Sequence, residues 1–284
     1  MNNLSLDIKQ GQLTCLLGSN GAGKTTLINL LLGRLTQMSG TISYFSDQQS
    51  IGDVRERVAA MLQNSTAPEK AKVGELLTLF SSYYHQPIPL NQLISQLNLS
   101  TLLNQRFGLL SGGQKQLVLL ALAMCGNPDI LFLDEPSVGM DVTARRTLWQ
   151  AISQYQSLGK TIILTTHYLE EADALADRII VLQDGSIAAD GSPTQLKSAF
   201  EHKTIKAKTT KSIHWLQQMP AVKQVVNSGH YVEVFTSNPA LTLKYWLNND
   251  NSLADFTVNS ADLEQAFLQL TSTDNNQSPM ELAS

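Results

Sequence analysis

The sequence predicts an α/β fold with a mixed core sheet, followed by a small α+β domain. Two observations support the first part: a glycine-rich loop at 18–25 joins a strand pattern to a helix pattern, and further buried-strand patterns follow at 130–135 and 160–164. A third observation supports the α+β domain: the pattern changes after about residue 200, where short strands and helices follow in the order β-α-β-β-α-β.

The loop Gly18–Thr25 has the form Gly-x-x-x-x-Gly-Lys-Ser/Thr. The apolar run Leu13–Leu17 before it suits a strand, and the run at 27–32 suits a helix, which is the context that a phosphate-binding loop requires. Backbone amides of such a loop and the start of the helix attract a polyphosphate. We expect Lys24 to reach the β and γ phosphates of a nucleotide and Thr25 to ligate magnesium. Alone, the pattern also fits a glycine-rich turn before a core helix.

A second motif is Ile130–Glu135, which follows the turn pair Pro128-Asp129. Its four apolar residues suit a strand that is buried on both faces of a parallel sheet. Two carboxylates then stand at the carboxyl end of this strand, where open α/β sheets bind their ligands. Asp134 would support the magnesium shell, and Glu135 would act as general base on the attacking water. Without the phosphate loop, an acidic pair that caps a turn would be an equal alternative.

A third motif is Leu110–Gln114, with the sequence Leu-Ser-Gly-Gly-Gln, before the apolar helix pattern Leu117–Cys125. Ser111 can cap that helix, and the glycines allow backbone amides to approach another molecule closely. One γ-phosphate cannot easily contact two helix starts of the same small domain. A head-to-tail dimer, in which Ser111 and Gly113 face the partner's ATP, resolves this. Alone, the segment also fits an ordinary Gly-Gly loop before a core helix.

Together these motifs resemble those of the nucleotide-binding subunit of ABC transporters, over residues 4–197. The resemblance implies a P-loop NTPase fold of ABC type, with ATP and Mg²⁺ as cofactors. It also implies that Gln63 touches magnesium and senses a transmembrane partner, that His167 contacts the γ-phosphate, and that Ser137–Asp141 faces the opposite subunit.

The expected site residues form three groups. Those implied in catalysis are Glu135, His167 and Gln63, and those that hold magnesium are Thr25, Gln63 and Asp134. ATP would be bound by Gly18, Ser19, Asn20, Gly21, Ala22, Gly23, Lys24, Thr25 and Thr26, and in trans by Ser111, Gly112, Gly113, Gln114 and Asp141.

The sequence departs from the family pattern at two places. Members usually begin further upstream, with an edge strand and an aromatic residue that stacks on adenine, whereas Leu4–Ile8 here already corresponds to the second strand. We therefore expect either a reading frame that continues upstream of Met1 or weakened ATP binding. The arginine that is common after the signature motif is also replaced, since Gln116 is followed by Leu117.

Length and composition agree with a soluble ATPase, and the resemblance implies a peripheral position on the cytoplasmic face of a membrane. The net charge of −4 argues against nucleic-acid binding, which usually needs a basic stripe. The longest apolar stretch, about nine residues, is too short to span a bilayer, so any membrane contact would occur through a permease. Cys15 and Cys125 lie in apolar settings and suit core residues in a reducing compartment.

Between the loop and the signature motif we expect a helical subdomain at 64–110 that faces a membrane partner, with helices at Val73–Phe80 and Leu90–Leu103. Tyr83, Tyr84 and His85 suit either contact with that partner or a core or rim position. After the strands at 160–164 and 178–182, Asp184-Gly185 predicts a hairpin into 186–188.

The expected domains are an ATPase domain at 1–200, an accessory α+β domain at 201–271 and a disordered tail at 272–284. The α+β domain is predicted to be a ferredoxin-like split unit. Its expected elements are strands at 204–208, 222–226, 231–235 and 256–258, and helices at 212–218, 239–247 and 261–270. The ending Ala261–Phe267 is similar to that of many drug, antibiotic or ion exporter ATPases.

The sequence thus favours the ATP-hydrolysing subunit of an exporter-type ABC transporter, acting as a homodimer or closely related heterodimer beneath a membrane-spanning permease. Two alternatives stay open. One is a soluble ABC ATPase that remodels a ribosome, DNA or a protein assembly, which tandem cassettes, a coiled-coil insertion or a basic arm would favour. The other is a non-catalytic nucleotide-gated adaptor, against which Lys24, Glu135 and His167 argue.

Overall fold

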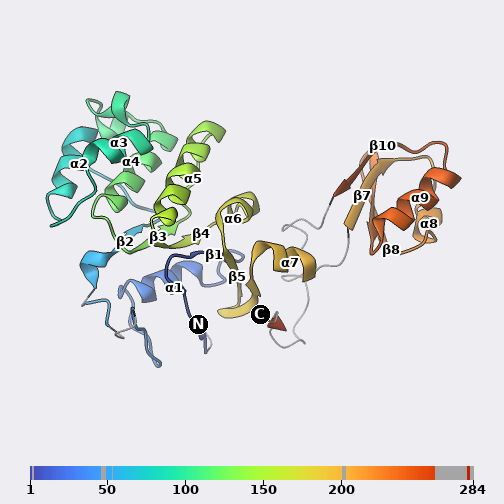
Figure 1. Cartoon of the computed structure of the whole chain (residues 1–284), viewed down its shortest axis with the longest axis horizontal. Coiled ribbons are helices and arrows are strands. Elements are labelled where there is room, and N and C mark those ends of the chain that lie inside the picture. The colour runs from blue at the N-terminus through green and yellow to red at the C-terminus, as the bar shows by residue number, and fades with distance from the viewer. Residues whose placement is uncertain (2, 46–48, 53, 200–202, 260–279, 282–284) are drawn as a thin grey trace. The chain divides into compact units, whose positions relative to one another are not determined.

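The computed structural model describes residues 1, 3–45, 49–52, 54–199, 203–259 and 280–281. The chain forms two compact units, which are described separately (Figure 1). The first contains Met1–Ser192 and the short strand Met280–Glu281, and the second begins at Pro193. The division therefore falls before the short helix α7 (Pro193–Ala199), a few residues ahead of the boundary expected at 200.

The first unit is built on a mixed seven-stranded sheet, in the order β11-β6-β5-β1-β4-β3-β2. Strand β1 pairs in parallel with β4 and β5, β3 pairs in parallel with β4 and β2, and β6 runs antiparallel to β5. The mixed core sheet is therefore present as predicted. The strands are β1 Leu13–Leu17, β2 Val58–Met61, β3 Ile130–Asp134, β4 Thr161–Thr165, β5 Arg178–Gln183, β6 Ser186–Gly191 and β11 Met280–Glu281.

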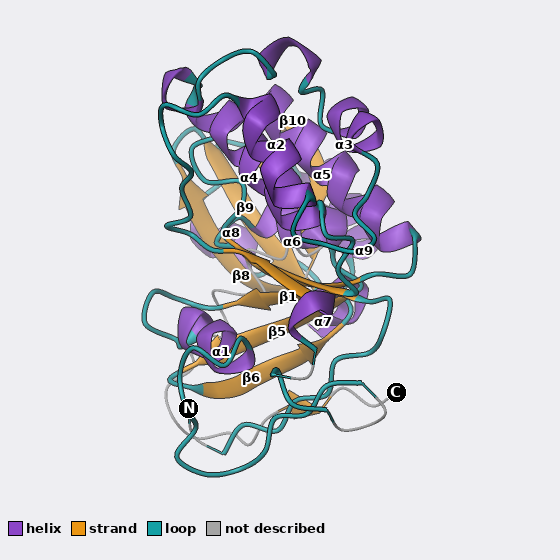
Figure 2. Ribbon diagram, turned by 90° about the vertical axis from the view of Figure 1, so that its left-hand side faces the viewer, coloured by secondary structure: helices purple, strands orange, loops and turns teal. Residues whose placement is uncertain are grey.

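Helices pack on this sheet, and α2, α3 and α4 form a group of their own (Figures 1 and 2). The first two of these helices lie in the segment 64–110, where a helical subdomain is expected, and α4 follows that segment. The helices of the first unit are α1 Lys24–Leu31, α2 Val73–Ser81, α3 Leu90–Gln96, α4 Gly112–Met124, α5 Val142–Ser157 and α6 Leu169–Leu175. Three short 3-10 turns occur at Arg55–Arg57, Ser100–Leu102 and Phe107–Leu109. None of the helices in the described ranges is long and apolar enough to cross a membrane.

The core of the first unit lies between the sheet and its helices. The side chains of Leu16, Ile28, Phe132 and Ile163 are almost fully buried there. Burial of each such side chain contributes roughly 1.5–3 kcal/mol of hydrophobic free energy. Each belongs to one of the apolar runs read from the sequence as a strand or helix, and their packing fixes the loops at the strand ends.

Two predicted elements of the first unit are wrong. The helix expected over Leu90–Leu103 ends at Gln96, because Asn98 has a left-handed φ of +54° that an α-helix cannot contain. The segment Leu4–Ile8 is not a strand. Its alternating apolar side chains are half-buried against the core cluster, and the Asp7 carbonyl accepts a hydrogen bond from the Arg178 side chain rather than from a neighbouring strand.

The second unit contains a four-stranded antiparallel sheet in the order β10-β7-β9-β8. Its elements follow the predicted order: β7 Lys203–Lys208, α8 Ile213–Gln217, β8 Val222–Ser228, β9 Tyr231–Thr236, α9 Pro239–Asn249 and β10 Ala254–Asn259. Ser212 and Asn238 cap the two helices, and the fully buried Trp246 lies in the core. The ferredoxin-like classification stays a prediction.

The last predicted elements lie mostly outside the described residues. This applies to the helix expected at 261–270 and to most of the tail at 272–284. Within that tail, Met280 and Glu281 pair in parallel with Ala189 and Asp190 of β6. These two residues therefore differ from the disorder expected for the tail, because β6 offers them a free edge of the sheet.

Candidate active site

The glycine-rich loop lies between β1 and α1, as its motif requires. Gly18 has a φ of +158°, and a Cβ atom there would lie 2.5 Å from the Leu182 carbonyl oxygen and 2.9 Å from Ala22 Cβ. Gly23 precedes α1 with a φ of +106°. Only glycine combines a positive φ with room for such close neighbours, so these two glycines allow the loop to turn tightly.

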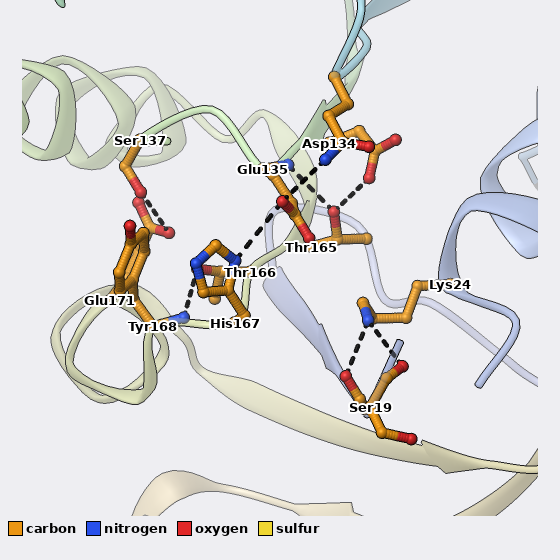
Figure 3. A network of polar contacts seen from close by, with 12 residues as sticks. Ser19, Lys24, Asp134, Glu135, Ser137, Thr165, Thr166, His167, Tyr168 and Glu171 are labelled. Carbon is orange, nitrogen blue, oxygen red and sulfur yellow. Dashed lines mark hydrogen bonds and ion pairs between the residues drawn. The ribbon is translucent and has the colours of Figure 1, made fainter. Parts of the chain in front are cut away.

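The Lys24 side chain is buried beneath this loop. Its ammonium donates hydrogen bonds to the carbonyl oxygens of Gly18, at 2.7 Å, and Ser19, at 3.1 Å (Figure 3). A cation in this position, beside the amino-terminal end of α1, suits a bound polyphosphate. Thr25 and Thr26 follow on the exposed first turn of α1.

The two carboxylates at the end of β3 have different surroundings. Asp134 is 3% exposed and accepts a hydrogen bond of 2.5 Å from the Thr165 hydroxyl. Glu135 lies just beyond the strand with a left-handed φ of +52°. Its amide donates to the carbonyl and hydroxyl oxygens of Thr165, at 3.0 and 3.1 Å. A non-glycine residue in this conformation costs on the order of 1–3 kcal/mol, and such strain is concentrated at functional sites.

Glu135 meets both of the other residues that the sequence assigns to catalysis. Gln63 Nε2 donates to Glu135 Oε2 at 3.1 Å, and His167 Nδ1 lies 3.5 Å from the same oxygen. The side chain of Glu135 is 13% exposed and that of His167 is 47% exposed. The carboxylate is thus shielded yet reachable, which suits a group that takes a proton from a water molecule.

The residues expected to hold magnesium offer suitable ligands. In the described ranges no three His, Cys, Asp or Glu side chains cluster as a metal site. However, Asp134 has a second carboxylate oxygen, Thr25 carries an exposed hydroxyl, and the Gln63 amide keeps its oxygen because its nitrogen points to Glu135. Oxygen ligands supplemented by phosphate and water are what Mg²⁺ prefers.

The signature motif begins α4 with a capping box. The Ser111 hydroxyl accepts from the Gln114 amide at 3.3 Å, and the Gln114 side chain accepts from the Ser111 amide at 2.9 Å. Gly113 is buried, and a Cβ atom there would lie 3.1 Å from Ala144 Cβ on α5. The motif therefore packs α4 closely against the start of α5 while Ser111 and Gly112 stay exposed.

Asp141 caps α5 by accepting a hydrogen bond of 2.8 Å from the Ala144 amide, and it is exposed. Within the described residues, the hydrogen bonds of Ser111 and Asp141 join neither of them to Lys24 or Glu135 of the same chain. The structure thus gives Ser111, Gln114 and Asp141 roles as helix caps, whereas Gln63 and His167 converge on Glu135 without them.

Sequence analysis missed Glu171 on α6. Its side chain is fully buried and accepts hydrogen bonds from Ser137 Oγ, at 3.0 Å, and Trp149 Nε1, at 2.9 Å. Burial raises the pKa of this carboxyl, against the effect of its hydrogen bonds and of nearby Arg145. The sequence held no signal for it, because a glutamate in an acidic first helical turn is normally exposed.

The helical group presents an apolar rim to solvent. Tyr83 is 68% exposed and His85 is exposed, whereas Tyr84 is half-buried against Gly126. A shallow cavity of about 540 Å³ lies on α2 and is lined by Gly74, Glu75, Thr78, Leu79 and Ser82. Leu79 is 48% exposed, so this face has an unfilled apolar edge.

Residues 1–138 match the family model described as "ABC transporter". The chain is 36% identical to the Nod factor export ATP-binding protein I of Burkholderia orbicola, over 69% of this chain and 67% of that protein. It is 35% identical to ABC transporter G family member 20 of Dictyostelium discoideum, over 72% of this chain and 29% of that protein. The chain thus spans less than a third of the length of this second relative.

A solved structure of an ATP binding subunit of an ABC transporter is also similar. It superposes with a TM-score of 0.62 at 26% identity, over 69% of this chain and 85% of the other. The resemblance read from the motifs is therefore confirmed, and with it the ABC-type P-loop fold. This chain belongs to the ABC transporter family and is one of its ATP-binding ATPase domains.

Proposed function

We propose that this chain is the ATP-hydrolysing subunit of an exporter-type ABC transporter, which dimerises head to tail around ATP and drives a separate membrane-spanning permease. The observation that carries the proposal is the convergence of Gln63 and His167 on the Glu135 carboxylate at the end of β3. Strand β4 separates β3 from β1, which leads into the phosphate loop.

In this proposal each residue has one task. Lys24 exchanges the Gly18 and Ser19 carbonyl oxygens for phosphate oxygens of ATP, since a charged acceptor binds an ammonium group more strongly. Glu135 takes a proton from the attacking water while Gln63 and His167 hold the carboxylate in place. Thr25, Gln63 and Asp134 would bind Mg²⁺, which supplies charge neutralisation between the phosphates.

The dimer is supported by the exposure of the signature motif. Ser111 and Gly112 begin α4 at the surface, and Asp141 begins α5 beside them. Exposed Leu109 and Val142, at 78% and 63%, flank these residues and would be covered by a second subunit. We expect either a homodimer or a heterodimer with a closely related chain, with Ser111, Gly112, Gly113, Gln114 and Asp141 facing the partner's nucleotide.

The permease would bind the exposed face of α2. The apolar rim formed by Leu79 and Tyr83, together with the cavity beside them, suits a short helix of a membrane protein.

Export as the direction of transport is supported by a relative named for Nod factor export. The chain would then lie on the cytoplasmic face of the membrane, held there by the permease. The alternative is a soluble ATPase that remodels a ribosome, DNA or a protein assembly, and the negative charge argues against the two nucleic-acid targets.

Site-directed cross-linking tests the transport role. Leu79→Cys carries a short cross-linker on the proposed permease face, and Leu158→Cys, at a position 59% exposed on the carboxyl end of α5, is the matched control. The native Cys15 and Cys125 are buried and should not interfere. We expect Leu79→Cys alone to capture a polytopic membrane protein in intact membranes. Capture of a ribosomal or other soluble assembly instead would replace the transporter with the remodelling ATPase.

A further inference from the structure

We propose that Glu171 is a positioning residue that couples the loop Ser137–Asp141 to the loop that carries His167, so that movement of one loop shifts the other. This proposal deepens the proposed function and rests on it, since Glu135 and His167 are the groups that Glu171 would position. The coupling would allow contact with a second subunit at Ser137–Asp141 to act on the hydrolysis site within this chain.

The Glu171 carboxylate joins three segments of the fold. One of its oxygens accepts from Ser137 Oγ at 3.0 Å (Figure 3). The other accepts from Trp149 Nε1 of α5 at 2.9 Å. The Thr166 side chain also lowers the pKa of this carboxyl, and the segment is tied to Glu171 through Tyr168, whose amide donates to the Thr166 hydroxyl at 3.0 Å and whose carbonyl accepts from the Glu171 amide at 3.1 Å. Glu171, Ser137 and Thr166 are each at most 1% exposed, so water cannot easily take the place of these bonds.

The residues that Glu171 holds stand directly beside the proposed catalytic pair. Ser137 is two residues after Glu135, and Thr166 immediately precedes His167. Because His167 Nδ1 lies 3.5 Å from Glu135 Oε2, a small displacement of either loop changes that distance. Glu171 thus provides a second connection between the two loops, in addition to the contact between the side chains of His167 and Glu135.

Burial of the Glu171 carboxylate is costly, so the hydrogen bonds that it accepts must offset that cost. Its burial raises its pKa, and Arg145, which also faces Tyr168 and Glu170, offsets only part of that effect. Replacement of a buried charge by well-packed apolar groups often leaves a protein as stable or more so. A group that accepts several hydrogen bonds at once is needed where separate segments must move together.

The second unit holds a matched control. Asp250 is also a buried carboxylate, and it accepts hydrogen bonds from an indole, Trp246 Nε1 at 2.9 Å, and from the hydroxyls of Thr209 and Ser252. The same chemistry therefore occurs in a unit that lacks the hydrolysis residues. Asp250→Asn reports what the loss of such a carboxylate does to folding alone.

The first experiment compares Glu171→Gln with Asp250→Asn in steady-state ATP hydrolysis by the full chain. Glutamine keeps the size of the side chain but has only one acceptor oxygen. We expect kcat to fall about ten-fold in Glu171→Gln, with KM for ATP changed less than about two-fold, and no change in Asp250→Asn. Unchanged kcat in Glu171→Gln, or an equal loss in both variants, would overturn the proposal.

A double-mutant cycle tests the coupling itself. Ser137→Ala and Thr166→Val each remove one hydroxyl, and if Glu171 joins them their effects on kcat are non-additive by about three-fold or more. The same pair of changes should be additive in the Glu171→Gln background. Additivity in both backgrounds would mean that the loops act independently of this carboxylate.

A readout without turnover separates this proposal from the proposed function. The ring resonances of His167, assigned by comparison with His167→Gln, should shift in Glu171→Gln and stay unchanged in Asp250→Asn. Failure of the proposed function would appear as absent hydrolysis in the wild-type chain while the His167 shift persists. Failure of the present inference would appear as unshifted His167 resonances in Glu171→Gln.

Discussion

The Gln63 side chain donates a 3.1 Å hydrogen bond to Glu135 Oε2, although 72 residues separate the two in the sequence. The register of the sheet explains this contact, because Met61 of β2 lies opposite Leu133 of β3 in a parallel pair. Residues two positions beyond each partner therefore also meet. The same reasoning places the loop after Thr165, which pairs with Asp134, beside Glu135. Parallel strands that end at one edge thus assemble the site.

Glu135→Gln is expected to leave ATP binding intact and to lower turnover by about 10²–10⁴-fold, the usual contribution of a general base. The amide has nearly the size of the carboxylate, and it can still hydrogen-bond to Gln63 and His167, but it cannot take a proton from water. Steady-state hydrolysis and a fluorescent ATP analogue measure the two effects separately.

The same variant should accumulate an ATP-bound dimer that size-exclusion chromatography detects. The wild-type chain with ADP serves as the control, since it should elute as a monomer. Turnover at the wild-type rate would remove Glu135 from its assigned role.

Ser111→Arg should block hydrolysis while a monomer still binds ATP, because the serine is expected to act on the partner's nucleotide. The exposed position of Ser111 lets an arginine be accommodated in the monomer, with loss of one helix cap that costs about 1 kcal/mol. Hydrolysis and ATP binding are measured on the variant alone.

Mixing Ser111→Arg with Lys24→Ala gives the sharper version of this test. The heterodimer keeps one composite site, with Ser111 from one chain facing ATP held by Lys24 of the other. We expect partial recovery of hydrolysis on mixing. If both groups acted on the nucleotide of their own chain, the mixture would stay inactive.

Gly18→Ala should weaken ATP binding by about ten-fold or more, because strain on the order of 1–3 kcal/mol must be relieved by moving the loop. The added methyl group would lie 2.5 Å from the Leu182 carbonyl oxygen, which belongs to a central strand and cannot move easily. Gly52→Ala is the control, since its nearest neighbour, Ser50 Oγ, would lie at 3.5 Å. Equal affinity in both variants would mean that the loop tolerates a side chain at position 18.

Much of the fold was predictable because its strands are continuous apolar runs between turn residues. The runs at 13–17 and 130–134 become fully or almost fully buried strands, and Asp184-Gly185 forms the expected hairpin between β5 and β6. The segment Leu4–Ile8 alternates apolar and polar residues, which also suits a strand, yet it is not one, because pattern alone does not decide whether a segment pairs with a neighbour.

The candidate site was only partly predictable. Lys24, Glu135 and His167 belong to motifs whose residue types and spacing follow from phosphate chemistry, so their positions could be expected. Glu171 could not, because its partners Ser137 and Trp149 come together only after α5 and α6 pack. The sequence predicted that Ser111 caps a helix. It did not predict the capping role of Asp141, which was assigned only to contact with a partner.

The second unit should lose stability in acid because of Asp250. Burial raises the pKa of this carboxyl, but hydrogen bonds from Ser252, Thr209 and Trp246 outweigh that effect and lower it to about 2, from 3.8. Above about pH 5 the carboxylate is ionised whether the unit is folded or unfolded, so its hydrogen bonds contribute fully to the free energy of unfolding. Between about pH 5 and pH 2 the unfolded chain binds the proton first, so that free energy falls as the pH falls.

Urea unfolding followed by Trp246 fluorescence, in a chain with Trp149→Phe and Trp215→Phe, measures this loss from pH 5 to pH 2. Asp250→Asn should lower the stability at pH 5 and remove most of the acid dependence, because the amide cannot titrate. Asp255→Asn is the matched control: this carboxylate pairs with Lys208 on the same sheet, but its side chain is 59% exposed, and water screens such a pair strongly. An Asp250→Asn chain that loses stability in acid as steeply as the unsubstituted one would show that other carboxylates cause the transition, and that the buried hydrogen bonds of Asp250 do not set the acid stability of this unit.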